Sequence, residues 1–183
     1  IRYRDVLEIR PVIKTEFNIE GYPSDKFIEL VLSVKPDQVT LVPDAHDAIT
    51  SNAGWNVPRF RLFLADVVSV FRKEGIRTSI FVDTDPVNIE TAAMTGADRV
   101  ELYTEPYAAG FDKDAPSAIA PFINAAKIAR DSGLGLNAGH DLNLDNLRYL
   151  HQNIHILNIP ASYLVLYRAS GQEQKGFGDG VEY

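Results

Sequence analysis

Length, composition and charge already narrow what this chain can be. It has 183 residues, of which 45% are hydrophobic, enough for one domain with a buried core. Its formal net charge of −7 excludes a basic surface for duplex nucleic acid, and its lack of cysteine excludes disulfides, thiolate metal sites and a cysteine nucleophile. Because we find neither an apolar run of about 20 residues nor a secretory signal, we expect a cytoplasmic protein without a membrane span.

Apolar runs rich in β-forming residues recur along the chain. The first follows a charged amphipathic start, IRYRDVLEIR, which indicates a helix entered part-way and hence an N-terminally incomplete sequence. Five clear runs and a weaker sixth lie at residues 16–19, 38–42, 78–82, 100–103, 133–137 and 155–159. They are apolar on both faces, which is typical of strands in a sheet that helices cover.

Helical patterns with recognisable ends separate these runs. Two of them begin after Ser24 and Asp85, and three others cover residues 60–71, 117–132 and 143–152. Ser24 and Asp85 are capping residues, and Pro86 after the second is typical of a first helical position. Gly75 ends the helix that carries the apolar stripe of residues 60–71. The chain therefore alternates strand and helix.

This alternation predicts a parallel sheet with helical crossovers, for which two architectures compete. A doubly wound sheet usually has a glycine-rich first turn, and no G-x-G-x-x-G occurs here. A (β/α)8 TIM barrel needs about 250 residues and eight strands. We predict an α/β fold of the barrel type, with about six of the eight βα units in this chain.

The predicted barrel does not include the end of the chain. We expect residues 1–160 to form an incomplete TIM-barrel domain. Residues 161–183 end in a polar, glycine-rich and aperiodic stretch where a closing helix of the barrel belongs. This atypical tail is expected to be disordered, or foreign to the fold.

Three ionisable residues end predicted strands. Glu20 follows TEFNI, Glu101 lies in RVELYT, and His140 ends LGLNAGH. A charge at such a place costs several kcal/mol unless it is paired or used. The C-terminal edge of a parallel sheet is also where α/β enzymes build their active sites. The pattern therefore favours an enzyme with these three residues in its site.

Each of the three also has a structural interpretation. Glu20 is either a general base or a solvated loop glutamate. Glu101 shares one strand face with Tyr103, so it points into the barrel if its apolar neighbours face the helices. It is then a functional carboxylate, or one paired with Arg99 or Arg77. His140 either transfers a proton or is a loop histidine bonded to backbone.

Other polar clusters carry weaker signals. His46 lies on a loop with two aspartates but without a second histidine at ligand spacing, so we predict no metal site. Thr50 belongs to a polar loop that suits contacts to hydroxyl or phosphate groups. Serine-nucleophile motifs of the G-x-S-x-G type do not occur in the sequence.

Five motifs together resemble the pyridoxine 5′-phosphate synthase family: TEFNIEG, KPDQVTLVPD, SIFVDTD, GADRVELYT and LNAGHDLN. The resemblance covers residues 1–152 in order and with matching spacings. It implies a TIM-barrel, ring-closing enzyme of vitamin B6 biosynthesis. Such an enzyme joins 1-deoxy-D-xylulose 5-phosphate to 3-amino-2-oxopropyl phosphate and releases pyridoxine 5′-phosphate, phosphate and water. The resemblance implies no metal or organic cofactor, and a homo-oligomer, octameric in the family.

The resemblance also implies roles for single residues. Glu20 matches the family's proton acceptor, and Glu101 matches the glutamate that stabilises a cationic transition state. His140 matches the proton donor. Thr50 matches a threonine that contacts the deoxyxylulose phosphate, and Asp141 stands at a substrate-contacting position where some relatives carry glycine. Imine formation and ring closure need several proton carriers around one pocket, and carboxylates stabilise iminium-like cations.

The chain departs from the family at both ends. The family's first two strands, with an Asp-x-x-His stretch and a phosphate-binding arginine, have no counterpart here. Its last-strand Gly-His pair is replaced around residues 158–161. We therefore expect the 183-residue chain by itself to be inactive and poorly stable. Two alternatives stay open: a non-catalytic barrel fragment, or another phosphosugar-handling barrel enzyme.

Overall fold

Strands and helices alternate throughout the part of the chain that the structure describes. The computed structural model describes residues 3–43, 53–155 and 161–163. The strands are β1 (Asn18–Gly21), β2 (Gln38–Leu41), β3 (Arg77–Val82), β4 (Arg99–Tyr103), β5 (Gly135–Gly139) and β6 (Ala161–Tyr163). The helices are α1 (Tyr3–Ile9), α2 (Asp25–Val34), α3 (Val57–Lys73), α4 (Pro86–Met94), α5 (Glu105–Asp131) and α6 (Leu144–His155), with a 3-10 turn at Arg10–Val12.

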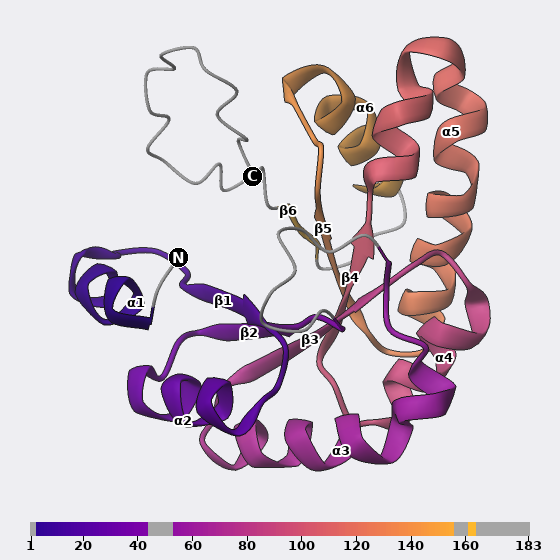
Figure 1. Cartoon of the computed structure of the whole chain (residues 1–183). Helices are drawn as coiled ribbons and strands as arrows, with labels where there is room; N and C mark the ends of the chain where they lie inside the picture. The colour runs from indigo at the N-terminus through magenta and orange to yellow at the C-terminus, as the bar shows by residue number, and fades with distance from the viewer. Residues whose placement is uncertain (1–2, 44–52, 156–160, 164–183) are drawn as a thin grey trace.

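The six strands are parallel and follow one another in a single sheet in the order of the sequence. In a doubly wound sheet the strand order reverses at a switch point, whereas in a barrel each strand pairs with the next along the chain. The observed order is that of a (β/α)8 barrel with about six of its βα units, so the predicted architecture is confirmed. Figure 1 shows the helices on the outer side of the curved sheet.

The hydrophobic core lies between the sheet and the outer helices. Fully buried strand residues alternate along β2 to β5 and belong to it: Val39, Leu41, Ile80, Val82, Val100, Leu102, Leu136 and Ala138. The helices contribute equally buried residues: Val31, Leu64, Val68, Phe71, Ile89, Ala125, Ala129 and Leu150. Burial of a side chain of the size of valine or leucine contributes about 1.5–3 kcal/mol. This layer therefore holds the helices on the sheet.

The residues that alternate with the core positions lie on the inner face of the sheet and are mostly polar. They include Asn18, Glu20, Gln38, Thr40, Arg77, Ser79, Arg99, Glu101 and Asn137. A barrel interior is ordinarily filled by branched aliphatic side chains, so this polar lining calls for a functional explanation. Because Val100 and Leu102 belong to the core, the prediction that Glu101 points inward is confirmed.

The helix ends predicted from the sequence are confirmed. Ser24 Oγ accepts a hydrogen bond from Phe27 N at 3.3 Å, and Asp85 Oδ1 accepts one from Val87 N at 2.8 Å. Gly75 follows α3 with a φ of 73°, which glycine adopts without steric cost. These caps satisfy backbone groups that a helix end leaves without an intrahelical partner.

The sixth strand lies later than the sequence predicts. Residue 155 is the last residue of α6, and β6 begins at Ala161, which pairs with Leu136 of β5. The prediction of a strand at residues 155–159 is wrong at its first residue, because Leu150 and Ile154 are both fully buried at helical spacing and continue α6. Residues 156–160 lie outside the described residues. The strand extends the sheet into the range expected to be a tail, and the rest of that range is not described.

Helix α5 is two helices joined at a kink. Asp114 has φ −159° and ψ 84°, and it separates a first segment that follows Thr104 from the predicted segment of residues 117–132. Its side chain caps the second segment, because Oδ1 accepts from Ser117 N at 3.1 Å and Oδ2 accepts from Ser117 Oγ at 2.7 Å. The first segment was not predicted from the sequence.

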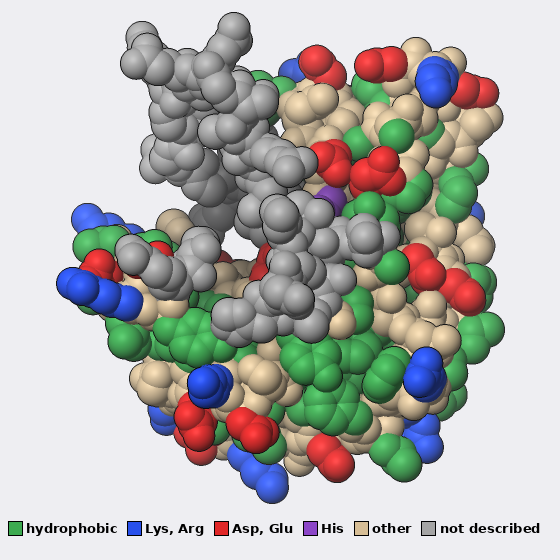
Figure 2. Space-filling view, in the orientation of Figure 1, with side chains coloured by type: hydrophobic (Ala, Val, Ile, Leu, Met, Phe, Trp, Pro, Cys, Tyr) green, Lys and Arg blue, Asp and Glu red, His purple; other side chains and the backbone are tan. Residues whose placement is uncertain are grey.

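Trp55 fixes the connection between the ends of two central strands. Its Nε1 donates to Leu41 O at 2.9 Å, and its backbone N donates to Phe81 O at 2.9 Å. Its ring contacts Tyr22 and Phe60 at centroid distances of 6.0 and 5.2 Å. Figure 2 shows hydrophobic side chains gathered over this part of the surface, around α3.

Within the described residues, no helix is both long enough and apolar enough to cross a bilayer.

Candidate active site

Glu101 is a buried acid on the inner face of β4. Only 1% of the surface of Glu101 is exposed, and its Oε2 lies 3.1 Å from Thr40 Oγ1. Among the described residues, Oε1 has no hydrogen-bond partner. Burial raises the pKa of Glu101 well above its ordinary value, and the negative charge of Glu20 raises it further. A paired arginine would instead lower this pKa, so the balance opposes the interpretation as a structural ion pair.

Both arginines that were considered as partners of Glu101 have contacts elsewhere, and Arg99 Nη1 donates to Asn137 Oδ1 at 3.1 Å. Arg77 forms an ion pair with Glu16, and its Nε donates to Gln38 Oε1 at 2.8 Å. These contacts lie at the N-terminal ends of the strands. They leave the C-terminal half of the inner face to the carboxyl groups.

Glu20 lies within β1 rather than on a solvated loop. It is half-buried, and its Oε1 accepts a hydrogen bond from Asn18 Nδ2 at 3.2 Å. Burial raises its pKa. Residue pairing places Glu20 beside Thr40 on the neighbouring strand, and Thr40 in turn contacts Glu101. The structure therefore brings together the two glutamates that the sequence singles out.

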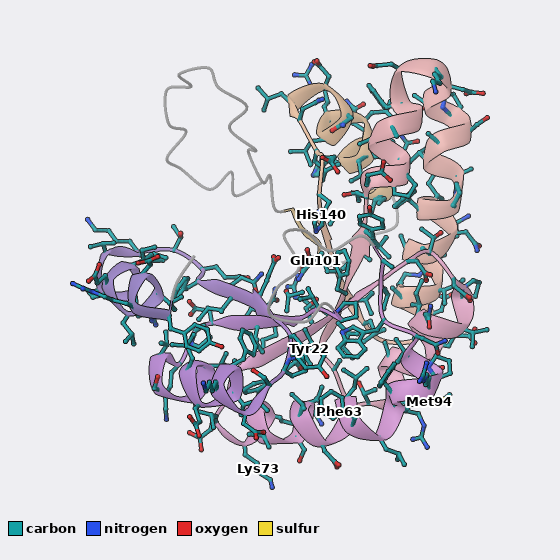
Figure 3. The ribbon with its side chains drawn as sticks, in the orientation of Figure 1. Tyr22, Phe63, Lys73, Met94, Glu101 and His140 are labelled. Carbon is teal, nitrogen blue, oxygen red and sulfur yellow. The ribbon has the colours of Figure 1, made fainter. Side chains whose placement is uncertain are left out.

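His140 follows β5 directly and lies against aromatic residues of two other strands. Its ring contacts Phe81 at 5.3 Å and Tyr103 at 5.5 Å between centroids. Phe81 is paired in register with Glu101, so the imidazole borders the layer that holds the buried acid. In Figure 3 Glu101 and His140 lie in the middle of the molecule, whereas Lys73 and Met94 lie on outer helices.

The backbone at the end of β5 is held in an unusual conformation. His140 and Asp141 have φ values of 77° and 55°, in a region that side-chain-bearing residues seldom adopt. Thr104 Oγ1 donates to His140 O at 2.6 Å, and Asn146 Nδ2 donates to Asp141 O at 3.1 Å. Backbone strain of this kind costs about 1–3 kcal/mol per residue and concentrates at functional sites. The contacts from α5 and α6 thus impose the direction in which His140 leaves the strand.

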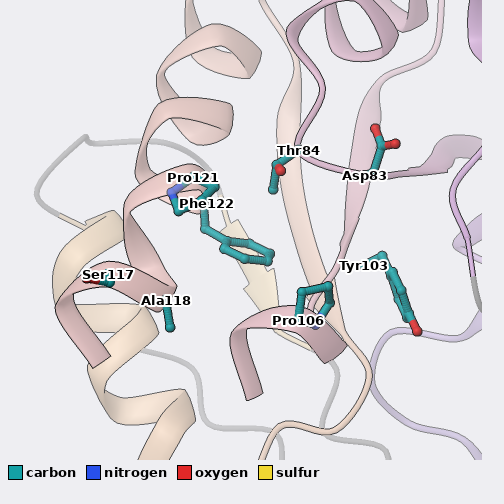
Figure 4. A pocket seen from close by; sticks show the side chains of 8 residues that line it. All are labelled: Asp83, Thr84, Tyr103, Pro106, Ser117, Ala118, Pro121 and Phe122. Carbon is teal, nitrogen blue, oxygen red and sulfur yellow. The ribbon is translucent and has the colours of Figure 1, made fainter. Parts of the chain in front are cut away.

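Two cavities lie beside this turn. One, of about 240 Å³, is shown in Figure 4 and is lined by Asp83, Thr84, Tyr103, Pro106, Ser117, Ala118, Pro121 and Phe122. The other, of about 320 Å³, is lined by Glu105, Ala108, Ala109, Asp141, Asn143 and Asn146. Neither Glu20 nor Glu101 is among the lining residues of these two cavities, whereas Asp141 lines the second one.

Thr50 lies outside the described residues, as does the loop with His46 that was considered for a metal. Two neighbours of the glutamates, Asn18 and Thr40, were not predicted as site residues. A signal for them exists in the sequence, because both are polar and stand at every second position with Glu20 and Gln38. Without the pairing of the strands, however, that pattern does not show which polar residues meet.

The arrangement suits chemistry with several proton transfers. A buried acid with a raised pKa can hold a proton near neutral pH, and a second carboxyl beside it can accept one. Buried carboxylates also stabilise positive charge strongly because little water screens them. His140 at the rim of the same layer adds a third side chain that can carry a proton.

Known proteins resemble this chain in sequence and in fold. A family model described as "Pyridoxal phosphate biosynthesis protein PdxJ" matches residues 1–169. The chain belongs to this family. The resemblance predicted from the five sequence motifs is therefore confirmed, and membership of the PdxJ family places the polar inner face in a TIM barrel.

Individual relatives carry the name pyridoxine 5′-phosphate synthase. The protein of Parabacteroides distasonis is 64% identical over 154 residues, and that of Phocaeicola vulgatus is 62% identical over 154 residues. Both matches cover 84% of this chain, and the chain spans only 65% of the length of these two relatives. The protein of Bacteroides thetaiotaomicron is 55% identical over 177 residues, which are 92% of this chain and 75% of that protein.

A solved structure described as "Native KDPGal structure" resembles this chain in fold. The TM-score is 0.54 at 13% sequence identity, over 93% of this chain and 66% of that one. At this identity the likeness concerns the fold alone, and it agrees with the barrel arrangement of the six strands.

Proposed function

We propose that the whole protein is a pyridoxine 5′-phosphate synthase. In this role it condenses 1-deoxy-D-xylulose 5-phosphate with 3-amino-2-oxopropyl phosphate, and it releases pyridoxine 5′-phosphate, phosphate and water. The observation that carries the proposal is the buried Glu101, with a raised pKa and Glu20 as its neighbour, on the inner face of a PdxJ-family barrel. The names of the relatives support the same activity.

The proposed roles follow from the environment of each group. Glu20, which is half-buried, accepts protons released during condensation. Glu101 stabilises the cationic intermediates electrostatically from within the barrel. His140, held at the strand end by its strained backbone, donates a proton to a leaving oxygen. Thr50 and Asp141 are proposed to contact the phosphorylated substrates. We further propose that the protein is a cytoplasmic homo-oligomer and needs no cofactor.

The activity is tested with the whole protein and both phosphorylated substrates. We expect pyridoxine 5′-phosphate to form, as detected by chromatography, and Glu101→Gln to lower turnover by about 10² or more, the usual scale for loss of an electrostatic stabiliser. Glu29→Gln, which removes a glutamate from the exposed side of α2, is the matched control and should keep its turnover. Absence of product in the unmodified protein contradicts the proposal and favours another phosphosugar-handling barrel enzyme.

A further inference from the structure

A line of polar side chains crosses the inner face of the sheet and connects an arginine to both glutamates. Arg77 Nε lies 2.8 Å from Gln38 Oε1, and Gln38 Nε2 lies 3.3 Å from Asn18 Oδ1. Asn18 Nδ2 lies 3.2 Å from Glu20 Oε1. Thr40 Oγ1 lies 3.2 Å from Asn18 Oδ1 and 3.1 Å from Glu101 Oε2. Every contact lies within hydrogen-bond distance, so the direction of each bond can be deduced.

The arginine determines the orientation of both amides. A guanidinium has only donors, so the Gln38 atom that faces Arg77 must be its oxygen. Gln38 then presents its NH₂ group to Asn18, whose facing atom must accept and is therefore Oδ1. The Asn18 NH₂ group is left to face Glu20, as observed. Neither amide can be turned over without placing two donors or two acceptors against each other.

The amide orientation in turn determines where the proton of Thr40 goes. A hydroxyl has a single proton, and Thr40 Oγ1 lies between two oxygens, Asn18 Oδ1 and Glu101 Oε2. Asn18 Oδ1 carries no proton and already accepts from Gln38 Nε2, so its contact with Thr40 is a hydrogen bond only if Thr40 donates. The remaining contact is then satisfied only if Glu101 carries a proton and donates it to Thr40 Oγ1. At the other end, Glu20 Oε1 accepts from the Asn18 amide, and an ionised carboxylate is a stronger acceptor for this bond than a neutral acid.

We infer that Gln38, Asn18 and Thr40 are positioning residues that hold Glu101 as the neutral acid and Glu20 as the ionised acceptor in the free site. In that state the pair shares one proton, and Glu20 is ready to take another from a substrate. The inference rests on the proposed function, because it assigns the starting protonation of the proposed proton acceptor. Burial and mutual repulsion favour the same division, since Glu101 is the more buried of the two carboxyl groups.

The charged groups other than the two glutamates lie toward the ends of the strands. Arg77, Glu16 and Arg99 lie near the N-terminal ends of the strands, where Arg99 Nη1 donates to Asn137 Oδ1 at 3.1 Å. His140 and Tyr103 lie at the C-terminal ends and contact each other. The bridge through Thr40, by contrast, contacts Glu101 directly and reaches Glu20 only through Asn18.

Infrared spectroscopy of the whole protein without substrate tests the assignment. A protonated buried carboxyl group has a C=O band separate from the carboxylate bands, and ¹³C-glutamate labelling shifts it. At neutral pH we expect this band in the unmodified protein, its loss in Glu101→Gln and its persistence in Glu20→Gln. Glu29→Gln is the control on the outer surface. A band that disappears in Glu20→Gln and persists in Glu101→Gln overturns the inference, as does the absence of any such band.

Gln38→Glu provides a sharper test, because it should reverse the direction of the hydrogen bonds between Asn18, Thr40 and the two glutamates. Its carboxylate accepts from Arg77 and also requires a donor from Asn18, so the Asn18 amide turns over. Thr40 then accepts from the amide and donates to Glu101, while Glu20 needs a proton to donate to the amide oxygen. In this background the band should disappear with Glu20→Gln and persist with Glu101→Gln. A band that still disappears with Glu101→Gln in this background overturns the inference. If Gln38→Glu does not fold, the infrared spectra of Glu101→Gln and Glu20→Gln in the otherwise unmodified protein decide.

The infrared measurement and the product assay test different claims, so either claim can be contradicted while the other stands. Missing pyridoxine 5′-phosphate together with the expected band contradicts the synthase activity and leaves the proton assignment intact. Product formation with the proton on Glu20 contradicts the assignment and leaves the activity intact. Thr40→Ser, which keeps a hydroxyl, should retain the order of the two glutamates, and a change of order in this variant also contradicts the role of the bridge.

Discussion

At the scale of single residues, Glu101 shows how position changes the chemistry of an ordinary side chain. A glutamate in water ionises near pH 4.3. In β4 it is surrounded by protein, it contacts one hydroxyl, and it faces a second carboxyl group. The charged form loses hydration that the single contact with Thr40 replaces only in part, so burial and the charge of Glu20 raise its pKa. The same feature makes Glu101 useful and costly to the fold.

The cost predicts a pH-dependent stability that Glu101→Gln removes. Because the pKa of Glu101 is higher in the folded protein than in the unfolded chain, the folded form binds more protons between the two values. Stability therefore falls as pH rises through that interval. We expect Glu101→Gln to have a Tm similar to that of the unmodified protein near pH 4 and a higher one at neutral pH. Thermal unfolding at several pH values measures this, and equal pH profiles for both proteins would contradict it.

At the scale of elements, one buried amide connects two helices to the end of a strand. Asn88 Oδ1 accepts from Val57 N at the start of α3 at 3.0 Å, and Asn88 Nδ2 donates to Asp83 Oδ1 after β3 at 2.9 Å. Asn88 lies on α4 and is buried. The first N–H groups of a helix lack an intrahelical partner, and the amide oxygen supplies one for Val57 N. This contact aligns α3 with α4.

Replacement of Asn88 by leucine should weaken this alignment. Leucine has similar volume but no acceptor, so the buried Val57 N–H is left without its partner, which costs about 1–3 kcal/mol. We expect a correspondingly lower free energy of unfolding in urea. The control is Glu90→Ala on the exposed side of the same helix, which should change stability by no more than about 0.5 kcal/mol. Equal losses in both variants would show that Asn88 acts only through helix propensity.

At the scale of the whole molecule, the parallel sheet joins all six strands without an interruption. Each outer helix packs on this sheet through one continuous hydrophobic core. The single tryptophan of the chain, Trp55, is 2% exposed and is bonded to the ends of two of these strands. Its fluorescence therefore reports on the centre of the sheet and on the site that the sheet carries.

We expect unfolding of this sheet to be cooperative. Tryptophan fluorescence reports the Trp55 contacts, and far-ultraviolet circular dichroism reports all helices, so the two transitions in urea should have the same midpoint. The reason is that the core shared by the sheet and helices cannot be lost in one part without exposing the rest. A fluorescence transition at clearly lower urea concentration would show that the region around Trp55 unfolds separately.

Local sequence signals predicted much of the architecture. Ser24, Asp85 and Gly75 end helices where capping chemistry requires it, and the strand–helix alternation implies a parallel sheet. The weak run at residues 155–159 was wrong as a strand at its first residue, because buried Ile154 continues the helical spacing and α6 ends only at residue 155; its other residues lie outside the described ones. Of the two segments of α5, the sequence predicted only the second, residues 117–132, and the segment before the kink at Asp114 was missed.

The sequence by itself determined the family and the candidate site residues: Glu20, Glu101 and His140 stand out as ionisable groups at the ends of apolar runs, and the motifs around them define the family. Only the tertiary structure decided which groups meet. Strand pairing places Thr40 between Asn18 and Glu101, and it places His140 against rings from two other strands. The physical reason is that burial and hydrogen-bond direction depend on neighbours supplied by other strands, whereas the alternation of faces along one strand depends only on its own residues.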